Sequence, residues 1–378
     1  MKTSSYKFIS DTIRKPFFSI IISILLGFII SGIILLIFGY NPIETIESLM
    51  LGLFGRPKFV TNIIIKSAPL ILTGLSVAFS FKAGLFNIGA EGQYIVGSLA
   101  TTIVGLSIDF PPYIQIPILI LVGIVSGGIW GGLAGLLKAK FSINEVIGTI
   151  MLNFIALHLS NYICMIDKFH QPNTNGTYPI NKNGLIMILN DWKLSKEGIS
   201  MLKDNKILND ILLKTDLNFG ILISIACVLM IWLLLYKTTS GYEIRSVGLN
   251  MDASRCAGIN INKNIIYSMS ISGALAGLSG AISIMGLSPH CTYLLSIFEG
   301  NGFNALAVAL IAKCSPIGCI FSGLLFSGLS YSGRFLQLQC GTPSEIVNIV
   351  IGIIILFIAA SNFMPIVADK IFERGANK

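Results

Sequence analysis

The chain has 378 residues, of which 53% are hydrophobic and 12% are charged, and its formal net charge is +8. Soluble domains carry about 25% charged residues, so this composition excludes an ordinary soluble enzyme and indicates a protein that crosses a membrane several times. Nucleic acid binding is also excluded, because the Lys and Arg residues form no continuous basic run. In membrane proteins the location of such residues matters more than their sum.

Ten segments approach or reach the roughly 20 apolar residues that a helix needs to cross a bilayer. The first is too long for the apolar part of a cleaved signal peptide, and the eighth is short enough for a half-helix. Gly and Pro interrupt several of them, as is common where membrane helices pack closely or break. We predict an all-α, polytopic membrane protein with about ten transmembrane helices, at Phe17–Gly39, Thr61–Phe81, Gly84–Gly105, Tyr113–Leu137, Ile143–Cys164, Asn218–Tyr236, Ile265–Leu287, Gly300–Ala312, Pro316–Gly333 and Glu345–Met364.

The basic residues of the short loops predict that both chain ends lie in the cytoplasm. With the N-terminus inside, most of these residues fall on the cytoplasmic side, as the positive-inside rule requires. Residues 165–217 then form a long polar loop outside the cell, either a cap over a pathway or a docking surface. Residues 237–264 form the longest cytoplasmic loop.

Residues 1–378 are predicted to form one transmembrane domain with an inverted internal repeat, 61–164 against 265–364. Phe-Asn occurs twice in the chain, at Phe86-Asn87 and Phe303-Asn304, and each pair opens a span. By the predicted orientation the first copy starts at the cytoplasmic face and the second at the outer face. Repeats of this kind hold solutes near the middle of the membrane.

A second shared pattern opens the fifth and tenth spans. Ser142 precedes Glu145 by three positions, and Thr342 precedes Glu345 by the same spacing. This is the spacing of a capping box, in which each side chain satisfies a free backbone N–H. Capping alone is the favoured role of these two glutamates.

The polar segment Gly84–Gln93 opens the third span and holds the candidate site. Glu91 lies well inside a span, and an intramembrane carboxylate is a functional candidate by default. On a helix Asn87, Glu91 and Tyr94 would share a face, while Gln93 would point elsewhere. Two interpretations of Glu91 stay open, contact with a solute and bracing of a broken helix.

Aromatic side chains near both copies are candidates for stacking on a flat solute, with ordinary packing as the alternative. The predicted pathway residues are therefore Phe86, Asn87, Glu91, Tyr94, Phe303 and Asn304.

The cytoplasmic loop contains a predicted short helix that is suited to docking on a partner. Asn250 or Asp252 precedes the small residues Ala253 to Ala257, and Gly258 stops the helix. An ordinary connector is the alternative.

No metal or cofactor site is predicted. His158, His170 and His290 have no metal-ligand spacing, the seven cysteines include no CxxC motif, and no GxxxxGK[ST] loop for ATP is present. A membrane-embedded enzyme is therefore disfavoured.

Four segments carry a resemblance to a known family: GYEIRSVGLNMDASRCAGIN, KAGLFNIGAEGQYIVGSLA, NEVIGTIMLNFIA and FNALAVALIAKCSPIG. They resemble permease subunits of ABC importers in the branched family that serves nucleosides, ribose-type sugars and branched-chain amino acids, and the nucleoside branch in particular. The similarity departs at Ser254 and Cys256, where Ala and Tyr are usual, and at Asn304-Ala305, where Asp-Gly is usual.

The resemblance implies a permease of a bacterial plasma membrane that moves nucleosides by alternating access. It implies three partners, namely an ABC ATPase, a second permease subunit and an extracytoplasmic substrate-binding lipoprotein. Two alternatives remain, an ABC permease for a simple sugar or amino acid, and an ion-coupled secondary transporter. The predicted ATPase-coupling residues are Glu243, Arg245, Gly248, Asn250, Ala253, Arg255 and Gly258.

Overall fold

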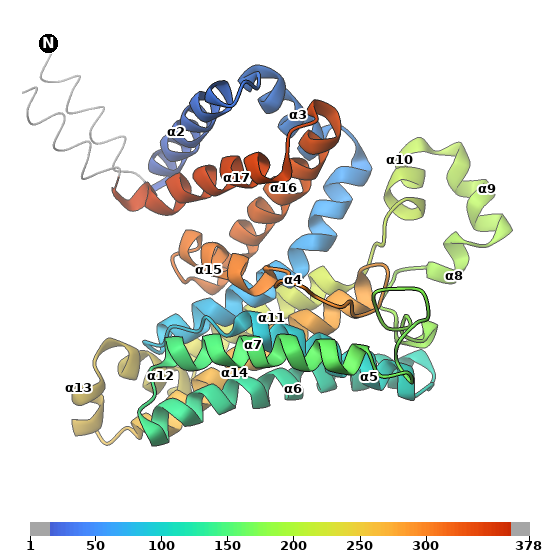
Figure 1. Cartoon of the computed structure of the whole chain (residues 1–378). Coiled ribbons are helices and arrows are strands. Elements are labelled where there is room, and N and C mark those ends of the chain that lie inside the picture. The colour runs from blue at the N-terminus through green and yellow to red at the C-terminus, as the bar shows by residue number, and fades with distance from the viewer. Residues whose placement is uncertain (1–15, 364–378) are drawn as a thin grey trace, which may run out of the picture. The chain divides into compact units, whose positions relative to one another are not determined.

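The computed structural model describes residues 16–363, and every regular element in that range is a helix, with isolated β-bridges only. Each of the ten predicted spans overlaps a helix, although several helix ends differ from the predicted ones (Figure 1). Met364, the last residue of the tenth span, lies outside the described residues, as do the basic residues of both tails. The ten helices are α2 (Pro16–Ile37), α4 (Pro57–Lys82), α5 (Ala90–Ser107), α6 (Pro112–Phe141), α7 (Glu145–Cys164), α11 (Gly220–Lys237), α14 (Ile261–Gly286), α15 (Asn301–Ile311), α16 (Pro316–Cys340) and α17 (Ser344–Ala359).

Five of these helices, α4, α6, α7, α11 and α14, are long and apolar enough to cross a membrane. The chain is therefore an integral membrane protein. One further helix, α3 (Pro42–Phe54), was not predicted. It begins where the Asn41 side chain accepts a hydrogen bond from the Ile43 backbone N–H, and proline occupies its first position.

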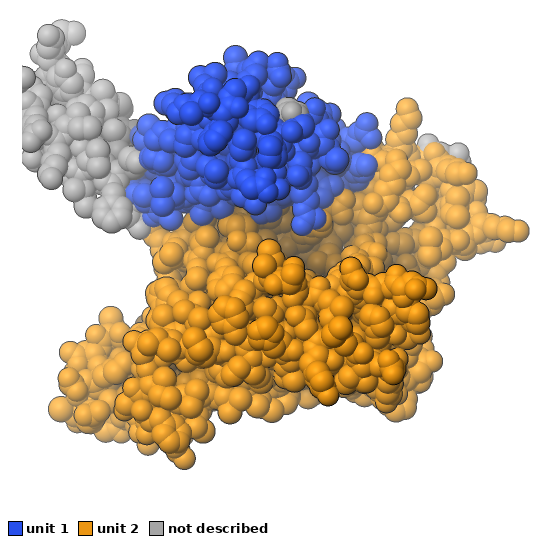
Figure 2. Space-filling model, in the orientation of Figure 1, with its two compact units in different colours: residues 1–59, 328–378 blue, residues 60–327 orange. Residues whose placement is uncertain are grey.

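The chain divides into two compact units, coloured separately in Figure 2. The first unit contains residues 1–59 and 328–378. In it α2 packs on α17, where a Cβ atom on Gly27 would lie 3.1 Å from the Ile354 Cα. The Phe59 ring contacts Tyr331 and Phe335, with centroids 5.9 and 5.2 Å away. The short 3₁₀ turn η3 (Ala360–Phe363) follows α17.

The second unit contains residues 60–327, and α14 is its central helix. Glycines let α6 and α14 approach until their backbones touch, since a Cβ atom on Gly127 would meet the carbonyl oxygen of Gly273. A Cβ atom on Gly123 would lie 2.6 Å from that of Ala281. Small residues at such spacing are the usual means of close helix packing in membranes.

Paired serines join α4 to α14. The Ser76 hydroxyl donates to the Ser272 carbonyl oxygen at 2.6 Å, and the Ser272 hydroxyl donates to the Ser76 carbonyl oxygen at 2.8 Å. Two turns along each helix, the Ser279 hydroxyl donates to the Pro69 carbonyl oxygen at 2.8 Å. Because the position on α14 rises as that on α4 falls, the two helices are antiparallel.

The loop 165–217 folds back along the connection that precedes α15. Its Thr177 and Ile180 backbone N–H groups donate to the carbonyl oxygens of Thr292 and His290, each at 3.0 Å. The loop therefore covers this connection, while a docking role stays a prediction. The rest of the loop contains short helical elements, η1 (Lys182–Gly184), α8 (Asn190–Lys193), α9 (Lys196–Asp204), α10 (Lys206–Leu208) and η2 (Asn209–Leu213).

Both predicted capping boxes are wrong. Ser142 instead ends α6 in the left-handed conformation, with φ of 54°, because three residues separate α6 from α7. Asn144 caps α7 by accepting from the Val146 N–H at 2.9 Å. At α17 the residue before the helix is Pro343, which offers no side-chain cap, and the Thr342 hydroxyl is buried without a partner.

Candidate functional site

A non-helical loop separates α4 from α5 and turns on Gly84, whose φ of +71° suits glycine. The Asn87 side chain, fully buried, organises this loop. Its amide nitrogen donates to Gln93 Oε1 at 2.9 Å and to Ser272 Oγ at 2.8 Å. Its oxygen accepts from the Gly89 backbone N–H at 2.9 Å and from Gln93 Nε2 at 3.3 Å.

The prediction that Asn87 and Glu91 share a helical face with Gln93 pointing away is therefore wrong. The helix begins at Ala90, so Asn87 precedes it and pairs directly with Gln93. Both amide groups use each other as partners, which removes the desolvation cost of burying them. The hydrogen-bonding capacity of Asn87 is satisfied within the protein.

Asn153 on α7 anchors the same loop, and it was not among the predicted residues. Its oxygen accepts from the Gly92 backbone N–H at 2.8 Å, and its nitrogen donates to the Ile88 carbonyl oxygen at 3.0 Å. A Cβ atom on Gly92 would lie 2.7 Å from the Asn153 oxygen, so the contact requires glycine. An asparagine within a membrane span is the sequence signal for such a role.

Glu91 links the start of α5 to the start of α15. Its carboxylate, fully buried, accepts from the backbone N–H groups of Gly300 at 2.8 Å, Gly302 at 2.5 Å and Phe303 at 3.2 Å. These are free N–H groups at the beginning of a helix, where a negative charge is stabilised. Bracing of a broken helix, one of the two open interpretations, is thus an observed contact, while contact with a solute stays a prediction.

The aromatic candidates differ in exposure. Tyr94 is 3% exposed, and its hydroxyl donates to Ser283 on α14 at 2.8 Å, which ties α5 to α14. Phe86 is half-buried and meets Phe81 edge-on at 5.0 Å. Phe303 is 36% exposed and meets the Phe298 ring at 5.4 Å.

The two Phe-Asn pairs occupy different local positions. Phe86-Asn87 lies in the loop before α5, whereas Phe303-Asn304 lies inside the first turn of α15. The Asn304 backbone N–H donates to the Gly300 carbonyl oxygen at 2.8 Å, and its side chain is half-buried. The sequence similarity of the pairs therefore marks similar places in the chain but not the same backbone geometry.

The short helix predicted within residues 237–264 is present as α13 (Met251–Cys256), while its cytoplasmic location stays a prediction. Asn250 caps it by accepting from the Ala253 N–H at 3.0 Å, and Gly258, with φ of +80°, closes the turn that follows it. Ala253 and Arg255 are exposed on this helix. A capped helix with exposed small and basic residues is a suitable docking element.

A second helix, α12 (Thr239–Leu249), precedes α13 and lies against the Gly84 turn. A Cβ atom on Gly84 would lie 3.0 Å from the Gly248 Cα, and one on Gly248 would meet the Lys82 carbonyl oxygen. The two backbones are therefore in direct contact. A shift of α12 toward the Gly84 turn would therefore press on the loop that carries Asn87.

Glu243 and Arg245 hold α12 in place rather than pointing outward. Glu243 accepts from the Asn264 side chain on α14 at 3.1 Å. The Arg245 guanidinium lies over the Tyr236 ring at 5.1 Å, a cation–π contact. Outward-facing apolar surface on α12 comes from Tyr242, 63% exposed, and Leu249, 88% exposed.

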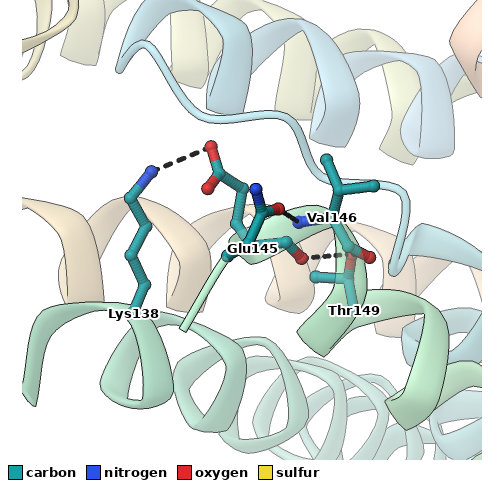
Figure 3. A network of polar contacts seen from close by, with 5 residues as sticks. Lys138, Glu145, Val146 and Thr149 are labelled. Carbon is teal, nitrogen blue, oxygen red and sulfur yellow. Dashed lines mark hydrogen bonds and ion pairs between the residues drawn. The ribbon is translucent and has the colours of Figure 1, made fainter. Parts of the chain in front are cut away.

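A polar network closes the turn between α6 and α7 (Figure 3). The Lys138 ammonium forms an ion pair with Glu145 at 2.8 Å, and the Thr149 hydroxyl donates to the Glu145 carbonyl oxygen at 2.7 Å. Glu145 therefore serves this turn by pairing with a lysine. Among residues 16–363 no three His, Cys, Asp or Glu side chains are grouped so as to hold a metal ion.

Comparison with known proteins supports one family. The family model described as "Branched-chain amino acid transport system / permease component" matches residues 59–359. The guanosine ABC transporter permease protein NupP of Bacillus subtilis is 38% identical over 94% of this chain and 97% of its own length. The nucleoside ABC transporter permease protein NupB of Lactococcus lactis is 37% identical over 93% and 92%.

A glucose ABC transporter permease protein of Haloferax volcanii is 28% identical over 91% of this chain and 87% of its own length. No solved structure shows a significant match to the chain.

Proposed function

Because the chain belongs to the family of branched-chain amino acid transport system permease components, we propose that it is the permease subunit of an ABC importer for nucleosides. The observation that carries this proposal is the similarity over nearly the full length of both chains to permeases named for guanosine and nucleosides. Family membership makes the chain a transporter subunit and not an enzyme. ATP hydrolysis belongs to a partner subunit, in agreement with the lack of a GxxxxGK[ST] loop.

In this proposal the chain crosses a bacterial plasma membrane ten times with both ends in the cytoplasm. Its halves 61–164 and 265–364 are inverted repeats. The antiparallel contact between α4 and α14, the opening helices of the two halves, supports this arrangement. The equal lengths of these helices, 26 residues each, support it as well.

The partners follow from the type of importer. An ATPase binds the surface of α12 and α13, a second permease forms the other wall of the pathway, and a substrate-binding lipoprotein delivers nucleoside from outside, near loop 165–217. The exposed Ala253 and Arg255 on a capped helix support the first of these contacts.

Transport proceeds by alternating access. Closure of the ATPases moves α13 and α12, and the Gly248 backbone pushes on the Gly84 turn. The Asn87 loop and Glu91 then shift together, and Glu91 carries the start of α15 through its hydrogen bonds to Gly300 and Gly302. A local shift is thus amplified into movement of one helix against another.

Phe303, Asn304 and Phe86 are the pathway residues best placed to meet a solute, since all three retain exposed surface. Asn87 and Glu91 make ligand contacts only if the pathway-opening step breaks some of their present hydrogen bonds. Their main role in the described conformation is to hold α5, α14 and α15 together.

The test is uptake of radiolabelled guanosine by cells that express the chain together with its ATPase, second permease and binding protein. We expect ATP-dependent uptake that unlabelled nucleosides inhibit and glucose does not. Inhibition by glucose alone would favour the sugar alternative, which we consider because the Haloferax relative is named for glucose. Uptake that persists without the ATPase would overturn the proposal.

A further inference from the structure

Two apolar helices of the second unit present faces that suit lipid. On α6 the exposed positions Leu121, Val125 and Ile129 are 61%, 46% and 61% exposed, and all are aliphatic. On α11 the exposed stripe contains Leu222, Leu229, Met230 and Leu233. Such faces match a hydrocarbon environment, which accepts no polar group without a partner.

The exposed face of α7 differs because it contains a histidine. Phe154, His158 and Tyr162 follow one another at intervals of four residues, and all three are exposed, Phe154 by 46% and Tyr162 by 70%. The opposite face, which includes Asn153 and Ala156, is buried against α5. His158 therefore points away from its own subunit.

His158 also lies well inside the span. At about 1.5 Å per residue it is roughly 20 Å from the start of α7 and about 9 Å from its end, and α7 is apolar enough to cross a membrane. Within the described residues the imidazole has no hydrogen-bond partner. Ionisable groups at such depth almost always face protein or a water-filled cavity rather than lipid.

Aromatic rings connect this face to the start of α15. The Phe154 ring lies 5.2 Å from Phe298, and Phe298 lies 5.4 Å from Phe303, each pair edge-to-face. Phe303 donates its backbone N–H to Glu91. The face of α7 is thus continuous with the helix start that the proposed mechanism moves.

We propose that His158 and the Phe154 ring one turn before it, which Phe298 connects to Phe303, line a water-filled solute pathway whose far wall is the second permease subunit. This inference rests on the proposed nucleoside function for its ligand. Flat rings provide stacking surfaces for a base, and an imidazole can donate to or accept from a base or a ribose hydroxyl. His158 would then be a specificity-determining residue of the pathway.

The test is thiol accessibility in whole cells that express the complete importer, with the seven native cysteines replaced. His158→Cys is compared with Ile129→Cys, a control at a similar depth, since Ile129 lies about 18 Å before the end of α6 and His158 about 20 Å after the start of α7, across a short turn. Thiolate is the reactive form and is suppressed in apolar surroundings, so we expect a hydrophilic methanethiosulfonate reagent to modify His158→Cys about 10-fold faster or more. Guanosine should slow that reaction and leave Ile129→Cys unaffected.

Equal and slow modification of both variants would overturn the inference, whether lipid or tightly packed protein covers the face. Fast modification that no nucleoside slows would retain the pathway and overturn the ligand contact. Failure of the nucleoside function itself shows separately, as absence of guanosine uptake by the parent importer. Uptake by His158→Gln and His158→Leu supplies a second readout: we expect Gln to keep more of the apparent affinity (lower KM) than Leu, and equal KM values would refute a hydrogen-bonding role.

Discussion

The carboxylate of Glu91 provides the most demanding test of the site, because three backbone N–H groups of the α15 start depend on it. A hydrogen bond to a charged group contributes about 1.5–3 kcal/mol, and an abandoned buried donor costs about 1–3 kcal/mol. Since these contributions are not additive, we expect Glu91→Ala to destabilise the second unit by about 3–5 kcal/mol, in the range seen for broken buried pairs. Glu91→Gln keeps one acceptor oxygen and should cost about half as much.

The assay is thermal unfolding of the purified permease in nanodiscs, followed by size-exclusion chromatography, together with guanosine uptake in cells. The Ala variant should lose roughly 5–10 °C of apparent melting temperature and nearly all uptake. Glu47→Gln, an exposed acid on α3, is the matched control and should behave as wild type. If Glu91→Ala melted and transported like wild type, the proposed brace between α5 and α15 would not exist in the membrane.

Three further predictions concern the contacts around this brace. Gly248→Val places a side chain against the Lys82 carbonyl oxygen, so uptake should fall while the assembled importer still hydrolyses ATP; loss of both activities together would indicate failed assembly instead. Asn153→Leu leaves the Gly92 N–H and the Ile88 carbonyl without partners, which should lower stability by about 2–4 kcal/mol, and Asn153→Asp should recover part of that loss by restoring the acceptor. Glu145→Gln removes a partly exposed ion pair with Lys138 and should change stability by about 1 kcal/mol or less, so a large loss in unfolding experiments would contradict this estimate.

The apolar helices and the short helix α13 were predictable because their determinants are local. Apolar length identifies a membrane helix from a window of the sequence. Asn250 and Gly258 delimit α13 through contacts within a few residues. In each case the stabilising interactions, apolar burial or helix capping, involve residues within one helical turn or one continuous segment.

The site itself was less predictable, since its contacts join distant parts of the chain. Glu91 bonds to residues more than 200 positions away, and so the sequence left two roles open. The partnership of Asn87 with Gln93 depends on α5 beginning at Ala90 rather than Gly84. A shift of a few residues in a helix start reverses which side chains face each other, and helix boundaries are the least certain feature of a sequence pattern.

The internal contacts of Glu91 also bear on how transport is energised. An ion-coupled transporter needs an intramembrane group that can bind and release a cation. In the described conformation the carboxylate oxygens of Glu91 are occupied by N–H groups of α15, and the adjoining Asn87 is satisfied by Gln93 and Ser272. Releasing Glu91 for a cation would break the connection between α5 and α15. A mechanical input through Gly248 uses that connection instead, which favours an ATP-driven permease over ion coupling on structural grounds.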